Sequence, residues 1–318
     1  MSFFKRKHKW QTFAAGEGLC KTFVKILQNI FGKVADNPGH CFFASFITGL
    51  VQVTFGYIMV KRRGKSVRES GAIIGWCMFF AISALMSGTA SLLAFLDPKA
   101  NMTVNTFIVT LSIIPGAILD KLIFKDKISQ RMVWGILLGI FAWWLALNTP
   151  SLRELFSLPA WVFWSLVTML CNATNNAISR HIRKVDNFVK NFWGGLVAVA
   201  ICPVVVYLLG EARLFTTFSV ETSRIWLLSI VIGFVVVAMW SFSLFSYQED
   251  ATIALKKLVM HGVWITTVMV ADALFFGKHF TVTMWLGLLV YFASFFLTDS
   301  GAWNYVVKKF KAQNLAIA

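Results

Sequence analysis

Charged residues are scarce in this chain, and acidic residues are the scarcest. Only 14% of its 318 residues are Asp, Glu, Lys or Arg, whereas soluble domains contain roughly a quarter. This scarcity excludes an ordinary soluble domain. The hydrophobic residues, 58% of the total, gather in runs of about 20, the length with which a helix crosses about 30 Å of hydrocarbon. We therefore predict an all-α, polytopic integral membrane protein.

Motifs for enzymatic and cofactor chemistry are missing as well. The sequence contains no phosphate-binding loop, HExxH, paired-cysteine metal site or glycine-rich nucleotide turn. We expect no cofactor, no metal and no enzymatic activity, and an energy source other than ATP. The cysteines are odd in number and scattered, which argues against a disulfide framework. They are Cys20, Cys41, Cys77, Cys171 and Cys202.

Features of nucleic-acid binding are missing despite a net charge of +16. The lysines and arginines lie mostly in short segments between apolar runs, where positive charge determines membrane topology. No basic-aromatic recognition motif accompanies them. We therefore expect no nucleic-acid partner. The expected partners are a small-molecule substrate and membrane lipid, and a homodimer is left open.

The apolar runs predict nine membrane-spanning helices joined by short loops. No loop between them is long enough for a soluble domain. The expected spans are residues 40–60, 71–96, 104–123, 131–149, 159–178, 191–209, 225–247, 252–275 and 281–299.

Basic residues alternate between the loops. Residues 61–70, 124–131, 179–190 and the C-terminal tail are rich in Lys and Arg, and the intervening loops contain few. By the positive-inside rule the basic loops and the C-terminus are cytoplasmic. We expect a multi-pass protein of the plasma membrane, specifically a bacterial inner membrane.

The N-terminus does not fit nine spans. Residues 1–37 contain seven Lys and Arg, which argues for the cytoplasm, yet nine spans would place this segment outside. An amphipathic helix within residues 12–33 is expected to lie on the membrane surface. The alternative is a polar tenth span whose charges face a cavity, and this alone restores the charge rule. The polar side comprises Glu17, Lys21, Lys25 and Gln28.

A weak internal repeat links the two halves of the chain. Residues 104–149 align with residues 256–301 at an offset of 152. Each unit reads as an apolar span, an aspartate, a short turn, a glycine and a second span. The loop charges give the two units opposite orientations, as in the inverted repeats of secondary transporters. The aligned pairs are Asp120 with Asp272, Leu122 with Leu274, Phe124 with Phe276 and Gly135 with Gly287.

These two units resemble the last two helices of each EamA-type repeat in the drug/metabolite transporter superfamily. In the first unit Pro115, Asp120 and Gly135 match the family pattern of a mid-helix proline, a terminal acidic residue and a glycine-rich helix. The second unit has Asp272 and Gly287, with Thr267 in place of the proline and aspartate where the family usually has glutamate. The resemblance, over residues 40–300, implies ten helices arranged as five plus five, with the substrate between the halves.

The resemblance divides the chain into four segments. Residues 1–37 form the basic amphipathic segment, and residues 38–150 form a first EamA-like repeat. Residues 151–300 form the second repeat, and residues 301–318 form a cytoplasmic basic tail.

The stretch "ALKKLVMHGVW", residues 254–264, is the first candidate for substrate binding. Lys257, His261 and Trp264 share one helix face through i+4 and i+3 spacing. A lysine at this depth usually faces protein or a water-filled cavity, where it would favour an anionic substrate. The alternative is that Lys256 and Lys257 extend to the cytoplasmic interface. His261 could transfer a coupled proton, because histidine titrates near working pH.

Amide and indole side chains are further candidates. Asn172, Asn175 and Asn176 lie on adjoining faces of one span, where they would bind polar groups or bond neighbouring helices. Trp76 and Trp240 lie within spans, as Trp264 does, and would line a pocket or pack in the core. Gln52, Thr54, Ser83, Ser87 and Thr89 are weaker candidates.

Two aspartates and two prolines have expected structural roles. Asp120 and Asp272, near the ends of their spans, are expected to hold the following turns by hydrogen bonds to turn amides. A direct role with a coupling ion is the weaker alternative. Pro115 and Pro203 lie inside spans and should kink them. Such a kink is static or serves as a hinge for alternating access.

Together these features predict a secondary transporter that moves a small organic metabolite by alternating access, with proton coupling left open. The alternative is a non-transporting membrane scaffold or a lipid-carrier flippase subunit. An intramembrane enzyme is a weaker third hypothesis. A central polar cavity between the halves would distinguish the transporter from the scaffold.

Overall fold

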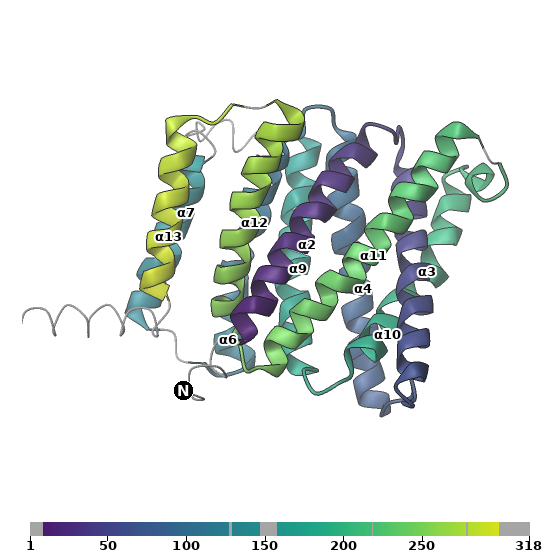
Figure 1. Cartoon of the computed structure of the whole chain (residues 1–318), viewed down its shortest axis with the longest axis horizontal. Coiled ribbons are helices and arrows are strands. Elements are labelled where there is room, and N and C mark those ends of the chain that lie inside the picture. The colour runs from purple at the N-terminus through teal and green to yellow at the C-terminus, as the bar shows by residue number, and fades with distance from the viewer. Residues whose placement is uncertain (1–8, 127–128, 147–157, 218, 278, 299–318) are drawn as a thin grey trace, which may run out of the picture.

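The chain folds into a bundle of helices that lie roughly side by side (Figure 1). The computed structural model describes residues 9–126, 129–146, 158–217, 219–277 and 279–298, and every regular element in these ranges is helical. The elements are α2 (Lys9–Gly32), α3 (Pro38–Arg62), α4 (Gly71–Leu96), α5 (Met102–Thr110), α6 (Ile113–Ile123), α7 (Gln130–Ala146), α9 (Ala160–His181), α10 (Asn187–Leu208), η1 (Ala212–Phe215), α11 (Val220–Gln248), α12 (Ile253–Phe276) and α13 (Val282–Thr298).

The helices have the lengths and compositions of a multi-pass membrane protein. Within the described ranges six segments are long and apolar enough to cross a membrane, and α7 and α13 contain shorter apolar stretches. To this extent the prediction of an all-α polytopic membrane protein is confirmed. The tail at residues 301–318 and residues 1–8 lie outside the described part. The six segments are Pro38–Arg62, Gly71–Leu96, Val104–Ile123, Asn187–Leu208, Thr222–Gln248 and Leu255–Phe275.

Local sequence signals set where several helices begin. The Asn37 side chain accepts from the His40 amide at the start of α3, and a proline follows it at the first helical position. Ser70 caps α4 in the same way. Ser219 and Thr222 form a reciprocal capping box at the start of α11. Each contact provides a partner for a backbone amide that has none within the helix.

The expected span at residues 104–123 is broken rather than kinked. α5 ends at Thr110, and α6 begins at Ile113. Pro115 lies in the first turn of α6, where its missing amide removes no hydrogen bond within that helix. Because proline has no amide hydrogen, Pro115 cannot donate to the Leu111 carbonyl oxygen. That oxygen accepts from the Ile114 amide at 2.9 Å instead. Pro203, by contrast, lies inside a continuous α10.

α2 packs within the bundle, alongside both α11 and α12 (Figure 1). Its polar side is buried against other helices: Glu17 is 0% exposed, and Lys21 and Lys25 are also buried. A helix on the membrane surface would turn this side to water, so the packing departs from that expectation. Gly18 permits the close approach to α12, since a Cβ there would lie 2.6 Å from the Met260 carbonyl oxygen.

The remaining helices pack in pairs drawn from distant parts of the sequence. α3 packs against α10, α4 against α9, and α7 against α13, with the last pair at one edge of the bundle (Figure 1). Small residues bring α3 and α10 together, because a Cβ on Gly49 would lie 2.9 Å from the Gly195 carbonyl oxygen. Apolar side chains fill the interior, as where Phe80 meets Trp240 edge to face at 4.9 Å.

Candidate functional site

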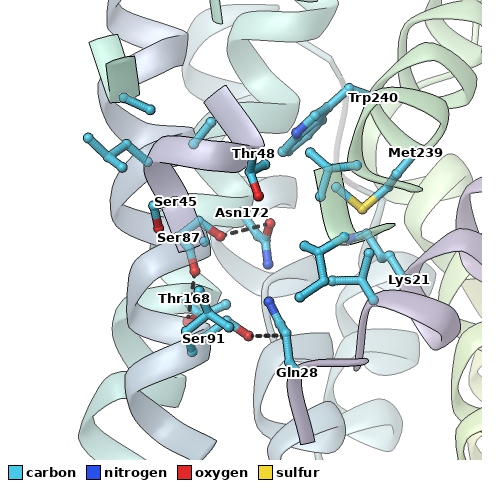
Figure 2. A pocket seen from close by; sticks show the side chains of 18 of the residues that line it. Lys21, Gln28, Ser45, Thr48, Ser87, Ser91, Thr168, Asn172, Met239 and Trp240 are labelled. Carbon is cyan, nitrogen blue, oxygen red and sulfur yellow. Dashed lines mark hydrogen bonds between the residues drawn. The ribbon is translucent and has the colours of Figure 1, made fainter. Parts of the chain in front are cut away.

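A pocket lies among α2, α3, α4, α9, α10, α11 and α12, and all seven helices contribute to its lining (Figure 2). Its empty volume is about 830 Å³, including space open to solvent. Small-molecule sites commonly combine apolar walls with a few polar groups. The lining of this pocket has that composition, with Met239 and Trp240 on α11 and Gln28 on α2 among its members.

The polar side of α2 supplies the charge of the pocket. Lys21 and Lys25 both line it. The Lys21 ammonium lies 3.8 Å from the Glu17 carboxylate and 5.0 Å from the centre of the Trp264 ring. The Lys25 ammonium donates to the Ser91 hydroxyl of α4. The i, i+4 spacing of Lys21 and Lys25 along α2 thus places both ammonium groups against the same cavity.

A chain of hydrogen bonds fixes the orientation of Gln28. An ammonium group can only donate, so the Ser91 hydroxyl accepts from Lys25 and donates its own proton to the Gln28 Oε1 at 2.7 Å. The amide oxygen of Gln28 is therefore engaged, and its NH₂ group points into the pocket (Figure 2).

Asn172 of α9 is held in the corresponding way on the opposite wall. Its Oδ1 accepts from the Ser87 hydroxyl at 3.3 Å, which assigns the oxygen and nitrogen of the amide. Figure 2 shows the amide nitrogens of Asn172 and Gln28 pointing toward each other across the cavity. The two walls therefore present donors to whatever occupies the space between them.

Behind the pocket lies a buried ion pair between α2 and α12. The Lys256 ammonium lies 2.7 Å from the Glu17 carboxylate, and both side chains are 0% exposed. The same ammonium donates to the Asn176 Oδ1 at 2.7 Å and to the Ser243 hydroxyl at 2.6 Å. Glu17 therefore serves both Lys256 and Lys21 and joins the N-terminal helix to the second half of the chain.

Three of the predicted substrate residues line the pocket: Asn172, Trp240 and Trp264. The others lie elsewhere. Lys257 is fully buried and donates to the Ser112 carbonyl at 2.6 Å, in the break between α5 and α6. Like Lys256 it does not reach a water interface. Lys257 lies two turns before Trp264 on the same helix face, but only Trp264 lines the pocket.

Four further predicted residues lie outside the pocket lining. His261 is fully buried, and its two ring nitrogens have no hydrogen-bond partner among the described residues. Asn175 is likewise buried and unpartnered in the described part of the chain, whereas Asn176 accepts from Lys256. Trp76 is 40% exposed and lies 4.6 Å from the His181 ring, far along α4 from the pocket-lining turns.

The Asp120 carboxylate forms an ion pair with another helix. It accepts from Arg180 of α9 at 2.6 Å, and Arg180 also bonds Asp126 at 2.7 Å. In the turn that follows, the Phe124 and Asp126 amides donate to the Asp120 backbone carbonyl oxygen. Asp272 lies in the last turn of α12, and its side chain is outside what the structure describes.

The residues that sequence reasoning did not select are Lys21, Lys25 and Gln28. Their i, i+4 and i+7 spacing along α2 was the available signal, and the polar-span alternative already had these groups facing a cavity. Gln52 and Ser87, which were weaker candidates, also line the pocket.

Comparisons with known proteins bear on the fold alone. No family model matches the chain, and no curated protein matches it. A solved structure described only as "Crystal structure of protein" is similar, with a TM-score of 0.63 and 11% sequence identity. The match covers 94% of this chain and 99% of that one. At this identity the likeness establishes a shared fold, and the EamA resemblance stays a prediction.

Proposed function

We propose that the protein is a secondary transporter that moves a small organic metabolite by alternating access. The observation that supports this most directly is the polar pocket, which is lined by helices from both halves of the chain. Secondary transporters hold their substrate at such a position between repeats. A scaffold does not require a cavity with cations and oriented amides. Each polar group left without a partner in the interior lowers the stability of the folded protein.

The proposed architecture is two inverted five-helix repeats of the EamA type. The first would comprise α2, α3, α4, the α5–α6 pair and α7, and the second α9 to α13. The contacts of α3 with α10 and of α7 with α13 each join two helices that the two-fold axis would relate. Such an axis requires that a contact of α4 with α9 be matched by one of α11 with α2. Both contacts are extensive, which supports the repeat.

This architecture makes α2 the tenth span and gives it a direction. The α2 end at Trp10 lies beside the C-terminal end of α11, where the Ser246 hydroxyl donates to the Trp10 carbonyl at 3.5 Å. The turn after α11 is cytoplasmic by its place in the loop order. A crossing α2 therefore begins in the cytoplasm, as its basic residues favour. We place the protein in a bacterial inner membrane with a cytoplasmic C-terminus.

Alternating access needs contacts that can close one side of the pocket. On the proposed cytoplasmic side, ion pairs join the two halves. Arg180 bonds Asp120 at 2.6 Å, and Lys65 bonds Asp186 at 2.7 Å. The break between α5 and α6 resembles the interrupted helices common in transporters. We propose that these ion pairs form the closed cytoplasmic gate and separate when the pocket opens inward.

A cavity-filling variant tests the transport proposal without knowledge of the substrate. A Cβ added at Gly88 meets no atom within 4 Å, and Gly88 lines the pocket. Gly88→Phe should therefore fill the pocket without displacing the backbone. Gly75 of the same helix also has open space, but it lies on the exposed surface outside the pocket. Gly75→Phe is the matched control.

Proteoliposomes loaded with a cell extract of metabolites provide the assay. Mass spectrometry of the retained contents should show compounds that the unaltered protein and Gly75→Phe deplete and that Gly88→Phe retains. If no compound leaves faster through the unaltered protein than through protein-free vesicles, the transport proposal is refuted and the scaffold reading gains support.

A further inference from the structure

The pocket presents hydrogen-bond donors and positive charge, with no carboxylate among its described lining residues. Lys21 and Lys25 supply two ammonium groups. Gln28 and Asn172 each turn an NH₂ group inward, because serine hydroxyls occupy their amide oxygens. This arrangement selects against cations, which would meet like charge and no acceptor of opposite sign.

A third kind of donor lies in the same wall. The Trp264 indole is 1% exposed, and its Nε1 has no hydrogen-bond partner among the described residues. Trp264 also lines the pocket. A buried indole N–H normally finds an acceptor. A ligand with acceptor oxygens would supply one.

The charge of the pocket is only partly balanced by the protein. Glu17 faces Lys21 at 3.8 Å and Lys256 at 2.7 Å, so one carboxylate is shared by two cations. Lys25 has the Ser91 hydroxyl and the Phe95 ring, 5.2 Å away, as neighbours, and no carboxylate within ion-pair distance in the described chain. A buried cation without a counter-charge is costly, and an anion in the pocket would offset that cost.

We propose that the pocket binds a small organic anion. Its carboxylate or phosphate lies between the two lysines of α2 and the amides of Gln28 and Asn172, in bonds strengthened by charge. Trp240 and Trp264 contact the apolar part of the ligand. This inference rests on the proposed function, since the anion would be the transported cargo. Carboxylates and phosphates share the chemistry that the site recognises, and the test below separates them.

Matched ligands test the charge requirement on the purified full-length chain in detergent. The probes are phenylacetate against phenylacetamide and phenethylamine, and glucose 6-phosphate against glucose. A ligand that binds the folded state raises the midpoint of thermal unfolding. An anion should raise it more than its matched uncharged and cationic partners. The pair that responds identifies carboxylate or phosphate as the preferred group.

An isosteric variant tests the location. Gln28→Glu replaces an inward NH₂ with a carboxylate beside Lys25, so the free protein keeps its fold while the anion meets repulsion. We expect the affinity for the responding anion to fall at least tenfold, measured by calorimetry. Asn172→Asp should act in the same direction from the opposite wall. Gln130→Glu, the same exchange at an exposed position at the start of α7, should leave the affinity unchanged.

The outcomes separate this inference from the transport proposal. Tighter binding of an uncharged or cationic partner, no response to either anion, or unchanged affinity in Gln28→Glu would overturn the anion site. Anion binding without flux in the proteoliposome assay would refute transport and leave the anion site intact. Flux confined to uncharged or cationic metabolites would refute the anion site and leave the transport proposal intact.

Discussion

Replacing Glu17 with glutamine should destabilise the protein more than any loss of a surface ion pair. The carboxylate is fully buried and lies 2.7 Å from the Lys256 ammonium and 3.8 Å from that of Lys21. With an effective dielectric constant of about 20, these attractions amount to about 6 and 4 kcal/mol. Much of this is offset by the cost of removing the carboxylate from water, which the variant avoids. Breaking one side of a buried pair typically costs about 3–5 kcal/mol, and we expect that loss for Glu17→Gln.

Unfolding by SDS in mixed micelles, followed by tryptophan fluorescence, measures this loss. The double variant Glu17→Gln with Lys256→Met should recover much of the stability, because it leaves one fewer unpaired cation. Asp250→Asn is the surface control. It removes an ion pair with Arg183 in which the side chains are 82% and 41% exposed, and such pairs contribute about 0–1 kcal/mol. If Glu17→Gln lowers the unfolding free energy no more than Asp250→Asn does, the buried pair does not stabilise α2 in the bundle.

Two further predictions concern helix contact and pH. Gly18→Leu should lower the unfolding free energy by about 1–3 kcal/mol, since its Cβ alone would lie 2.6 Å from the Met260 carbonyl oxygen. The control Gly75→Leu adds a side chain in open space and should leave the unfolding free energy unchanged. Equal effects of the two variants in the same SDS assay would contradict the packing of α2 against α12. Partial burial raises the pKa of the Asp186 carboxyl, but the hydrogen bonds from Lys65 and the Phe188 amide and the nearby positive charge outweigh burial, so the pKa lies below its ordinary value. A carboxyl whose pKa is depressed by folding stabilises the folded protein at pH values above its unfolded-state pKa. This stabilisation disappears as the pH falls through the folded-state pKa. The difference in unfolding free energy between the unaltered protein and Asp186→Asn should therefore be greatest near neutral pH and shrink in acid, and a difference that grows in acid would refute this reasoning.

The membrane-spanning pattern could be predicted because hydrophobic length alone encodes it. The expected span at residues 71–96 coincides with α4, and that at residues 252–275 differs from α12 by one residue at each end. The break at Leu111 and Ser112 was not predictable in the same way. A proline indicates that a bond is missing but not how the helix responds. Here the Ser112 carbonyl accepts from Lys257, 145 residues away, and that contact depends on tertiary packing.

The binding face of each helix was harder to predict than the helix itself. Asn172, Asn175 and Asn176 lie within little more than one turn, and only Asn172 lines the pocket. Similarly, Trp264 lines it while Lys257, two turns earlier on a shared face, fills the helix break. Helical periodicity relates residues to one another along one element. It does not specify the rotation of that element relative to its neighbours, which the whole bundle determines.

The helix that supplies the pocket's charge is also the one that hydropathy cannot identify as a span. Glu17, Lys21 and Lys25 keep α2 out of the set of segments that are apolar enough to cross a membrane. These charges are tolerable in the interior only because Lys256, Ser91 and, on our proposal, a bound anion compensate them. The compensation comes from other helices and from outside the chain, so no property of residues 9–32 alone reveals it. A search for apolar length will therefore miss a helix of this kind whenever its polar side forms the binding site.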